Sequence, residues 1–208
     1  MNKNVAFIGD VHGHSAALRT LIEVLEKRKI DEYVFLGDYI NRGPDSKGVV
    51  DYLLELQNRM GPERLVFLRG NHEESLVEFL ETDALGQFLS IGGAATVRSY
   101  HPAKVSSAPG NDFRKRIPST HVEFFLNLKE KQEEDEFIAS HKNSEGPVDK
   151  FFIYGHSFSL GEDYSESSIC IDTGCGFGGL LTALVWPHRK QIRVSESGEL
   201  MKDEFLQV

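Results

Sequence analysis

Three short segments of this 208-residue sequence combine glycine with side chains that bind metal ions or phosphate. They are residues 9–13 (Gly-Asp-Val-His-Gly), residues 37–43 (Gly-Asp-Tyr-Ile-Asn-Arg-Gly) and residues 69–73 (Arg-Gly-Asn-His-Glu). Their carboxylate, imidazole and amide groups are ligands for hard or borderline divalent metals, and the guanidinium of Arg42 has the planar donor geometry that suits a phosphate group. These segments indicate metal-assisted chemistry on a phosphorylated compound.

Two further histidines follow apolar runs later in the chain and complete a set of oxygen and imidazole donors. The candidate metal ligands are Asp10, His12, Asp38, Asn71, His141 and His156. The set contains no cysteine, so Mn²⁺ is the favoured metal, with Fe or Zn²⁺ as alternatives. A carboxylate shared by two metal ions about 3.5–4 Å apart would form a dinuclear clamp, with a bridging hydroxide for in-line attack on phosphorus.

Each of the first three segments directly follows an apolar run that predicts a buried strand. The runs are residues 5–8, 33–36 and 65–68. Helical spacing of apolar side chains predicts helices at 15–29, 46–60 and near 74–82. This alternation predicts parallel strands with helical crossovers. The carboxyl ends of such strands meet at one sheet edge, where open α/β sheets bind their ligands.

The rest of the chain gives a weaker pattern and then a run of short strands. A short helical stretch up to Ser90 and a helix at 119–128 flank a polar loop at 101–116, which is a candidate rim for the substrate. Strands are predicted at 136–140, 151–154, 168–171, 181–186 and 191–194. A second sheet packed on the first would bring five ligand-bearing strand ends to one edge.

Composition limits the class of protein and its partners. The length predicts one domain over residues 1–208. The formal net charge of −9 argues against duplex nucleic acid as a partner, because that affinity depends on basic surface. No run of 18 apolar residues and no leader-like start occur, which predicts a cytoplasmic protein without a membrane partner. The spacing of Cys170 and Cys175 predicts buried free thiols rather than a zinc or redox motif.

In this order, the three segments resemble the signature blocks of the calcineurin-like metallophosphoesterases. The Arg-Gly-Asn-His-Glu block resembles the bacterial and phage type of the phosphoprotein phosphatase branch. Residues 155–157, 171–174 and 178–184 resemble the C-terminal blocks of that branch. The resemblance implies an α/β fold with two mixed β-sheets packed as a sandwich and flanked by helices.

The resemblance also implies a role for each residue. Asp10, His12 and Asp38 would hold one metal ion. Asp38, Asn71, His141 and His156 would hold the second. Arg42 and Asn71 would contact the substrate, with Arg42 clamping the phosphate. His72 would protonate the leaving oxygen as a general acid, with Asn41 beside it.

The sequence departs from the family pattern at three places. One is Lys142-Asn143, directly after His141, where the family normally has small residues. Asn41 stands where the protein phosphatases of the family usually carry Asp. Asn41 can orient His72 but cannot stabilise an imidazolium by charge, so His72 should be a weaker acid. Residues 142–155 contain no second phosphate-clamping arginine. The candidate replacements are Lys142, Lys150, Arg98, Arg114 and Arg116.

The remaining candidates have structural interpretations. His14, His101, His121 and His188 match no block and are interpreted as surface or packing residues. We expect Asp172 to order the loop near His156 and Glu73 to brace its own segment.

Three functions follow from this pattern. The favoured one is a metal-dependent hydrolase of phosphate monoesters, a serine/threonine protein phosphatase that could also accept phosphotyrosine. The alternative, motivated by Asn41 and by the missing second arginine, is hydrolysis of a dinucleoside tetraphosphate or another small phosphorylated metabolite. A third, from a different class, is a non-catalytic phosphate-binding regulatory module. The expected partner is accordingly a phosphorylated protein or a small phosphorylated molecule.

Overall fold

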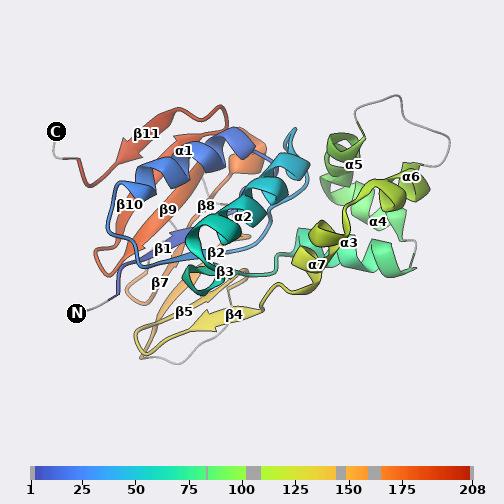
Figure 1. Ribbon diagram of the computed structural model, residues 1–208. Coiled ribbons are helices and arrows are strands. Elements are labelled where there is room, and N and C mark those ends of the chain that lie inside the picture. The colour runs from blue at the N-terminus through green and yellow to red at the C-terminus, as the bar shows by residue number, and fades with distance from the viewer. Residues whose placement is uncertain (1–2, 83, 102–108, 144–148, 159–164, 207–208) are drawn as a thin grey trace.

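Two β-sheets face each other in the computed structural model, which describes residues 3–82, 84–101, 109–143, 149–158 and 165–206 (Figure 1). The larger sheet has the strand order β11-β10-β9-β1-β2-β3, with β8 paired to β9, and the smaller has the order β4-β5-β6-β7. The strands of the larger sheet are β1 Val5–Ile8, β2 Glu32–Phe35, β3 Leu65–Phe67, β8 Asp172–Thr173, β9 Leu180–Trp186, β10 Lys190–Ser195 and β11 Leu200–Asp203. Those of the smaller sheet are β4 Lys131–Glu133, β5 Phe137–Ser140, β6 Phe151–Tyr154 and β7 Ser168–Cys170. This is the predicted sandwich of mixed sheets.

The parallel half of the larger sheet follows from its helical crossovers. Strands β1, β2 and β3 pair in parallel, and they are connected by α1 Ser15–Glu26 and α2 Ser46–Met60. Helix α2 begins where the side chain of Asp45 accepts a hydrogen bond from the backbone N–H of Gly48 at 3.0 Å. It ends at Gly61, whose φ of 89° lies in the left-handed region that glycine tolerates. The next residue, Pro62, begins the short 3₁₀ helix η1 Pro62–Arg64.

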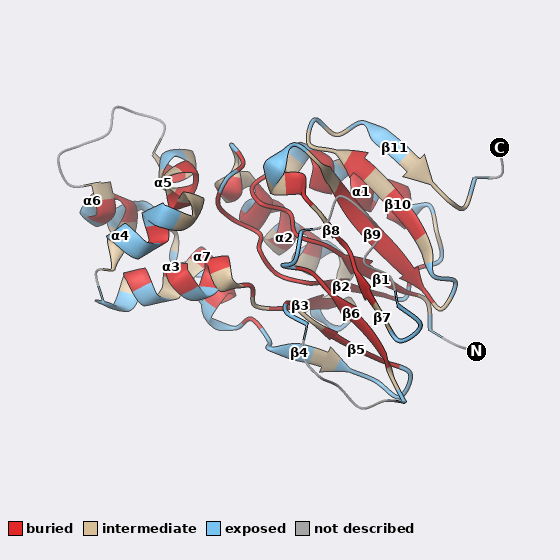
Figure 2. Ribbon diagram, turned by 180° about the vertical axis from the view of Figure 1, so that it is seen from behind, coloured by how far each residue is buried: buried red, intermediate tan, exposed pale blue. Residues whose placement is uncertain are grey.

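Apolar side chains fill both faces of the larger sheet. On one face, Phe7, Val34 and Leu36 pack against Phe137 and Ile153 of the smaller sheet. The opposite face packs against the apolar stripes of α1 and α2. Figure 2 shows these central strands as almost entirely buried. Because a fully buried large apolar side chain contributes about 1.5–3 kcal/mol, this double-sided burial holds the strand ends in place.

A group of helices covers one end of the sandwich (Figure 1). They are α3 Asn71–Thr82, α4 Leu85–Phe88, the π-helical turn η2 Leu89–Gly93, α5 Ala94–Tyr100, α6 Pro109–Arg116 and α7 Ser119–Leu126. Phe79, Phe88 and Phe113 stack on one another at their centre. None of the helices among the described residues is long and apolar enough to cross a membrane.

The structure corrects several predicted boundaries. Residues 109–116 form α6, so that part of the predicted 101–116 loop is wrong; residues 102–108 lie outside the described residues. Helix α3 begins at Asn71 rather than near residue 74. The strands predicted at 181–186 and 191–194 belong to the larger sheet rather than to the second one, because β9 pairs antiparallel with β1 and β10 pairs antiparallel with β9.

Candidate active site

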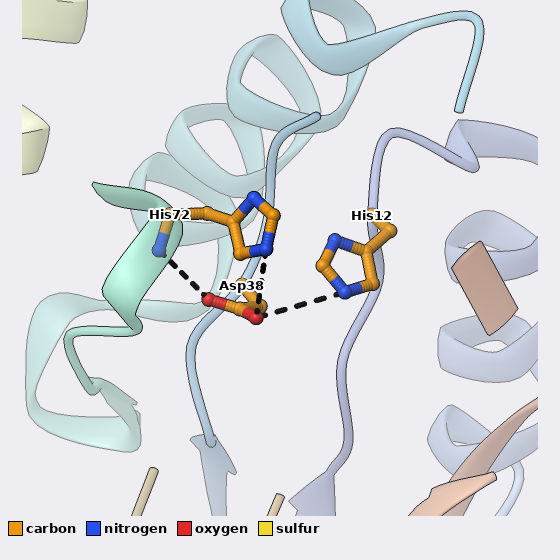
Figure 3. Close-up of side chains that lie close together, drawn as sticks. All are labelled: His12, Asp38 and His72. Atoms are coloured by element: carbon orange, nitrogen blue, oxygen red, sulfur yellow. Dashed lines mark hydrogen bonds and ion pairs between the residues drawn. The ribbon is translucent and has the colours of Figure 1, made fainter. Parts of the chain in front are cut away.

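Five strand ends converge on Asp38, as predicted from the sequence. Asp10 and His12 follow β1, Asp38 follows β2, Asn71 follows β3, and His141 and His156 follow β5 and β6. Nε2 of His141 lies 3.4 Å from Oδ1 of Asp38. Figure 3 shows the rings of His12 and His72 on either side of Asp38, each directing Nε2 toward Oδ2, at 3.6 and 3.7 Å.

The backbone of these segments is strained where it turns into the site. Among the described residues, non-glycine residues with positive φ are His12, Asp38, Asn41, Arg42, His156 and Arg189. All but Arg189 belong to the predicted site. Such conformations cost about 1–3 kcal/mol each and persist only where the surroundings enforce them. Glu73 supplies part of that enforcement, because its buried carboxylate accepts from the backbone N–H groups of Asp38, Tyr39 and Gly70 at 2.8–3.0 Å. The predicted bracing by Glu73 of its own segment is confirmed at Gly70, whereas the bonds to Asp38 and Tyr39 join a distant segment and were not predicted.

Two of the histidines present an unprotonated nitrogen to the site. Nδ1 of His12 lies 3.1 Å from the carbonyl oxygen of Ile40, and Nδ1 of His141 lies 3.0 Å from that of Leu36. Because a carbonyl only accepts, Nδ1 carries the proton in both rings and Nε2 keeps its lone pair. Burial, followed by the charge of Arg42, lowers the pKa of His12 to about 3. Burial, followed by His156, lowers the pKa of His141 to about 3, so both rings are neutral.

The site contains facing acceptors and crowded carboxylates that fit divalent cations. Nε2 of His141 lies 2.9 Å from Oδ1 of Asn71, so two groups with lone pairs face each other. Burial, followed by the charge of Asp172, raises the pKa of Asp10. Burial, followed by the charge of Glu73, raises the pKa of Asp38. A cation coordinated by these groups would attract the facing lone pairs and lower the pKa values of Asp10 and Asp38. Their hard and borderline donors suit Mn²⁺, Fe or Zn²⁺.

Two groups of side chains could each hold a metal ion, and they share Asp38. One is His12, Asp38 and His72; the other is Asp38, His141 and His156, with ligand atoms within 4.8 Å of one another in each group. The shared carboxylate agrees with the dinuclear arrangement implied by the sequence. The first group contains His72 rather than the predicted ligand Asp10, whose carboxylate accepts from the backbone N–H of His156 at 3.1 and 3.3 Å.

His72 is oriented by Asn41, as the sequence allowed. Nδ2 of Asn41 lies 2.8 Å from Nδ1 of His72, and the hydroxyl of Thr96 donates to Oδ1 of Asn41 at 2.7 Å. Since the amide nitrogen only donates, Nδ1 of His72 accepts, and the neutral ring carries its proton on Nε2. Burial, followed by the neighbouring His12, lowers the pKa of His72 to about 2. His72 therefore presents a neutral N–H donor to the site.

Arg42 is exposed at the mouth of the site. Its Nη1 donates to Nε2 of His12 at 2.9 Å, and its Cζ lies 4.0 Å from the ring centroid of Phe177. A guanidinium at this position can reach a phosphate placed among the ligands, and its planar fork offers two parallel donors to phosphate oxygens.

This geometry agrees with the result of a family comparison. The profile described as Calcineurin-like phosphoesterase matches residues 3–179, a span that contains every predicted site residue. The chain belongs to the calcineurin-like phosphoesterase family. It is therefore a phosphoesterase hydrolase rather than a non-catalytic phosphate-binding module. The family normally holds a dinuclear divalent metal site, for which the imidazoles of His12, His141 and His156 and the shared carboxylate of Asp38 offer ligand atoms.

This phosphoesterase is similar to three further proteins over different shares of its length. The chain is 27% identical over 246 residues to bis(5'-nucleosyl)-tetraphosphatase PrpE [asymmetrical] of Anoxybacillus flavithermus, covering 95% of this chain and 96% of that protein. A 73-residue segment is 36% identical to the serine/threonine-protein phosphatase PP2A-like PPG1 of Candida albicans, covering 35% of this chain and 17% of that protein. A solved structure provisionally assigned as a diadenosine tetraphosphatase shares the fold, with a TM-score of 0.67 at 22% identity over 93% of this chain and 94% of that chain.

The candidates for the missing phosphate-clamping arginine differ in their surroundings. Lys150 pairs with Glu133 at 3.0 Å, and the guanidinium of Arg114 donates to the carbonyl of Phe79. Lys142 follows His141 directly, and after burial its charge is the next cause of the lowered pKa of His156. The structure thus brings the charge of Lys142 close to the site.

The residues interpreted as structural have structural contacts. Asp172 accepts from the backbone N–H of Gly174 at 3.0 Å, which orders the turn after β8. His121 is buried, 2.8 Å from the hydroxyl of Tyr100. Both cysteines are free and buried, as predicted. Sequence reasoning missed Thr96, because it lies in a weakly patterned region 55 residues from its partner and no local signal marks it.

Proposed function

We propose that this phosphoesterase hydrolyses the phosphoanhydride bond of a dinucleoside tetraphosphate. The observation that carries the proposal is the hydrogen bond from Asn41 to His72, which leaves His72 a neutral and weak acid. A departing nucleoside phosphate needs little protonation, since phosphate has a second pKa near about 6. A departing serine alkoxide is far more basic and depends on a strong general acid. The pair therefore favours a substrate with a good leaving group.

Similarity along the whole chain supports the same substrate. The relative that matches 95% of this chain is named for tetraphosphatase activity, whereas the protein phosphatase matches only one segment. The sequence pattern alone favoured the protein phosphatase, because its Arg-Gly-Asn-His-Glu block is local. The substitution of Asn for Asp at position 41 lies outside that block and is the feature that points to the nucleotide.

The side chains would divide the work of the reaction. Asp10, His12, Asp38, Asn71, His141 and His156 would hold two divalent cations. When bound, these cations supply Lewis-acid polarisation of phosphoryl oxygens and lower the pKa of a coordinated water. Arg42 would clamp the transferred phosphoryl group through paired N–H donors. His72 would donate a hydrogen bond from Nε2 to the leaving oxygen, while Asn41 holds the ring in that tautomer.

A second candidate is a serine/threonine protein phosphatase. It is favoured by the 36% identity over 73 residues to the PP2A-like phosphatase. This function predicts release of inorganic phosphate from phosphoserine or phosphothreonine peptides, with a rate limited by protonation of the leaving alkoxide.

Identification of the products tests the proposal directly. Mn²⁺-loaded protein is incubated with diadenosine tetraphosphate, and the nucleotides are separated chromatographically, with Asp38→Asn as the control for metal-dependent turnover. We expect unequal fragments, AMP and ATP, as in the asymmetrical relative. Formation of two molecules of ADP would support diadenosine tetraphosphate as the substrate but contradict the asymmetrical position of cleavage. Intact substrate, together with phosphate release from a phosphopeptide, would replace this proposal with the second candidate.

A further inference from the structure

Two exposed aromatic rings lie together next to the candidate active site. Phe158 and Phe177 are 38% and 56% exposed, and their rings stack with centroids 5.3 Å apart and an interplanar angle of 15°. Among the large hydrophobic side chains exposed by the described residues, these two are the only aromatic ones. Most large aromatic rings among the described residues are buried in the core, whereas these two are exposed, so core packing does not explain them. Paired exposed rings beside a reaction centre are typical of a binding surface.

The backbone around the rings connects them to the ligands. Gly176, which precedes Phe177, packs so closely on His12 that a Cβ there would lie 2.7 Å from Cδ2 of the imidazole. Phe158 lies two residues after His156 in the sequence, and its ring packs on Gly174. The aromatic pair is therefore held by the same two segments that border the metal ligands.

Arg42 connects the aromatic pair to the phosphate position. Its guanidinium carbon lies 4.0 Å from the ring centroid of Phe177, while Nη1 reaches the ligand His12. One side chain thus contacts both the ring surface and the metal-ligand cluster. A bound molecule with a phosphate at Arg42 and a flat ring a short distance away would contact both.

We propose that Phe158 and Phe177 form a stacking platform for the nucleobase next to the phosphate that is cleaved. The inference rests on the proposed nucleotide substrate and adds a base-binding subsite to it. Aromatic side chains and arginine planes stack nucleobases with little sequence preference, because every base has a π-face. Since Arg42 already lies over Phe177, the platform extends away from the phosphate across Phe158. In a nucleotide the ribose separates the base from the phosphate, whereas the ring of phosphotyrosine is attached to its phosphate through one oxygen.

Binding of two uncleavable ligands that differ only in the base tests the platform. They are the phosphonate of AMP, in which a methylene replaces the bridging oxygen, and the matching ribose phosphonate. Calorimetry on Mn²⁺-loaded protein compares wild type with Phe158→Leu, Phe177→Leu and Met201→Ala, the last a control for truncating an exposed apolar side chain on β11. Stacking of one base strengthens binding roughly 5- to 150-fold. We expect wild type and Met201→Ala to prefer the AMP analogue by that factor, and both phenylalanine variants to lose most of the preference.

The outcomes separate this inference from the proposed function. Equal affinity of the wild-type protein for the two phosphonates overturns the platform, even if diadenosine tetraphosphate is cleaved. A preference for the AMP analogue that is unchanged in both phenylalanine variants also overturns it. A preference that depends on the rings, in a protein that leaves diadenosine tetraphosphate intact, supports the platform while removing the proposed function. Tighter binding of the phosphotyrosine phosphonate than of the AMP analogue would reject the nucleobase as occupant. Melting curves of each variant confirm that these exposed positions leave the fold intact.

Discussion

Replacement of Thr96 by valine should allow His72 to adopt both of its neutral tautomers. The Thr96 hydroxyl donates to Oδ1 of Asn41 at 2.7 Å and thereby turns Nδ2 of Asn41 toward His72. Valine keeps the shape of threonine but removes that donor. Because all three side chains are buried, Oδ1 of Asn41 would be left without this hydrogen bond.

The size of the effect follows from the hydrogen bond that is lost. A buried acceptor without a partner costs about 1–3 kcal/mol, which corresponds to a drop in melting temperature of about 2–12 °C for a chain of this length. The same free energy favours one amide orientation in the wild type by about 5- to 150-fold. Without it the two tautomers of His72 should approach equal populations, and turnover should fall about twofold.

The ¹⁵N spectrum of metal-free protein reports the tautomer, since protonated and unprotonated ring nitrogens differ in chemical shift. Wild type should show His72 protonated on Nε2, Thr96→Val a mixture, and Thr96→Ser the wild-type pattern because serine keeps the hydroxyl. An unchanged tautomer in Thr96→Val would refute the reasoning. An equal change in Thr96→Ser would show that packing, rather than the hydroxyl, orients Asn41.

Three other substitutions test separate parts of the site. Asn41→Asp places a carboxylate beside His72 and should raise the pKa of His72, since an opposite charge at this range shifts a pKa by about 1–3 units. Turnover of a phosphoserine peptide should then rise about tenfold, while turnover of diadenosine tetraphosphate changes little. Equal changes in turnover of both substrates would contradict the leaving-group argument. Asp38→Asn removes the shared carboxylate, so turnover should fall at least about 100-fold and Mn²⁺ should no longer raise the melting temperature; a retained Mn²⁺ effect would place the metal elsewhere. Lys142→Met should raise KM about two- to fivefold with kcat nearly unchanged, as expected for one exposed charge near the phosphate, and an unchanged KM would exclude Lys142 as a clamp.

The local parts of this architecture were predictable from the sequence. Helix α2 has the predicted bounds, because an N-terminal Asp45 and the Gly61-Pro62 pair mark its ends. Most of the ligand-bearing strand ends were also predictable, because the apolar runs at 5–8, 33–36 and 65–68 are short and lead into glycine and polar side chains. The meeting of these ends then follows from parallel pairing.

The remaining features depend on contacts between distant residues. The pairing of β9 with β1 joins segments about 180 residues apart, and no local pattern distinguishes it from pairing within the smaller sheet. The short helices α5 and α6 offer too few turns for a clear apolar period and are held by the packing of Tyr100 and Phe113. Thr96, Phe158 and Phe177 reach the site only through the tertiary fold.

The most direct test of the central claim is a side-by-side comparison of kcat/KM for two substrates with Mn²⁺-loaded protein. The substrates are diadenosine tetraphosphate and a phosphoserine peptide, measured under the same conditions. A neutral His72 held by Asn41 predicts a clear preference for diadenosine tetraphosphate. A clear preference for the peptide would contradict the account, because it would show that this weak acid still serves a poor leaving group.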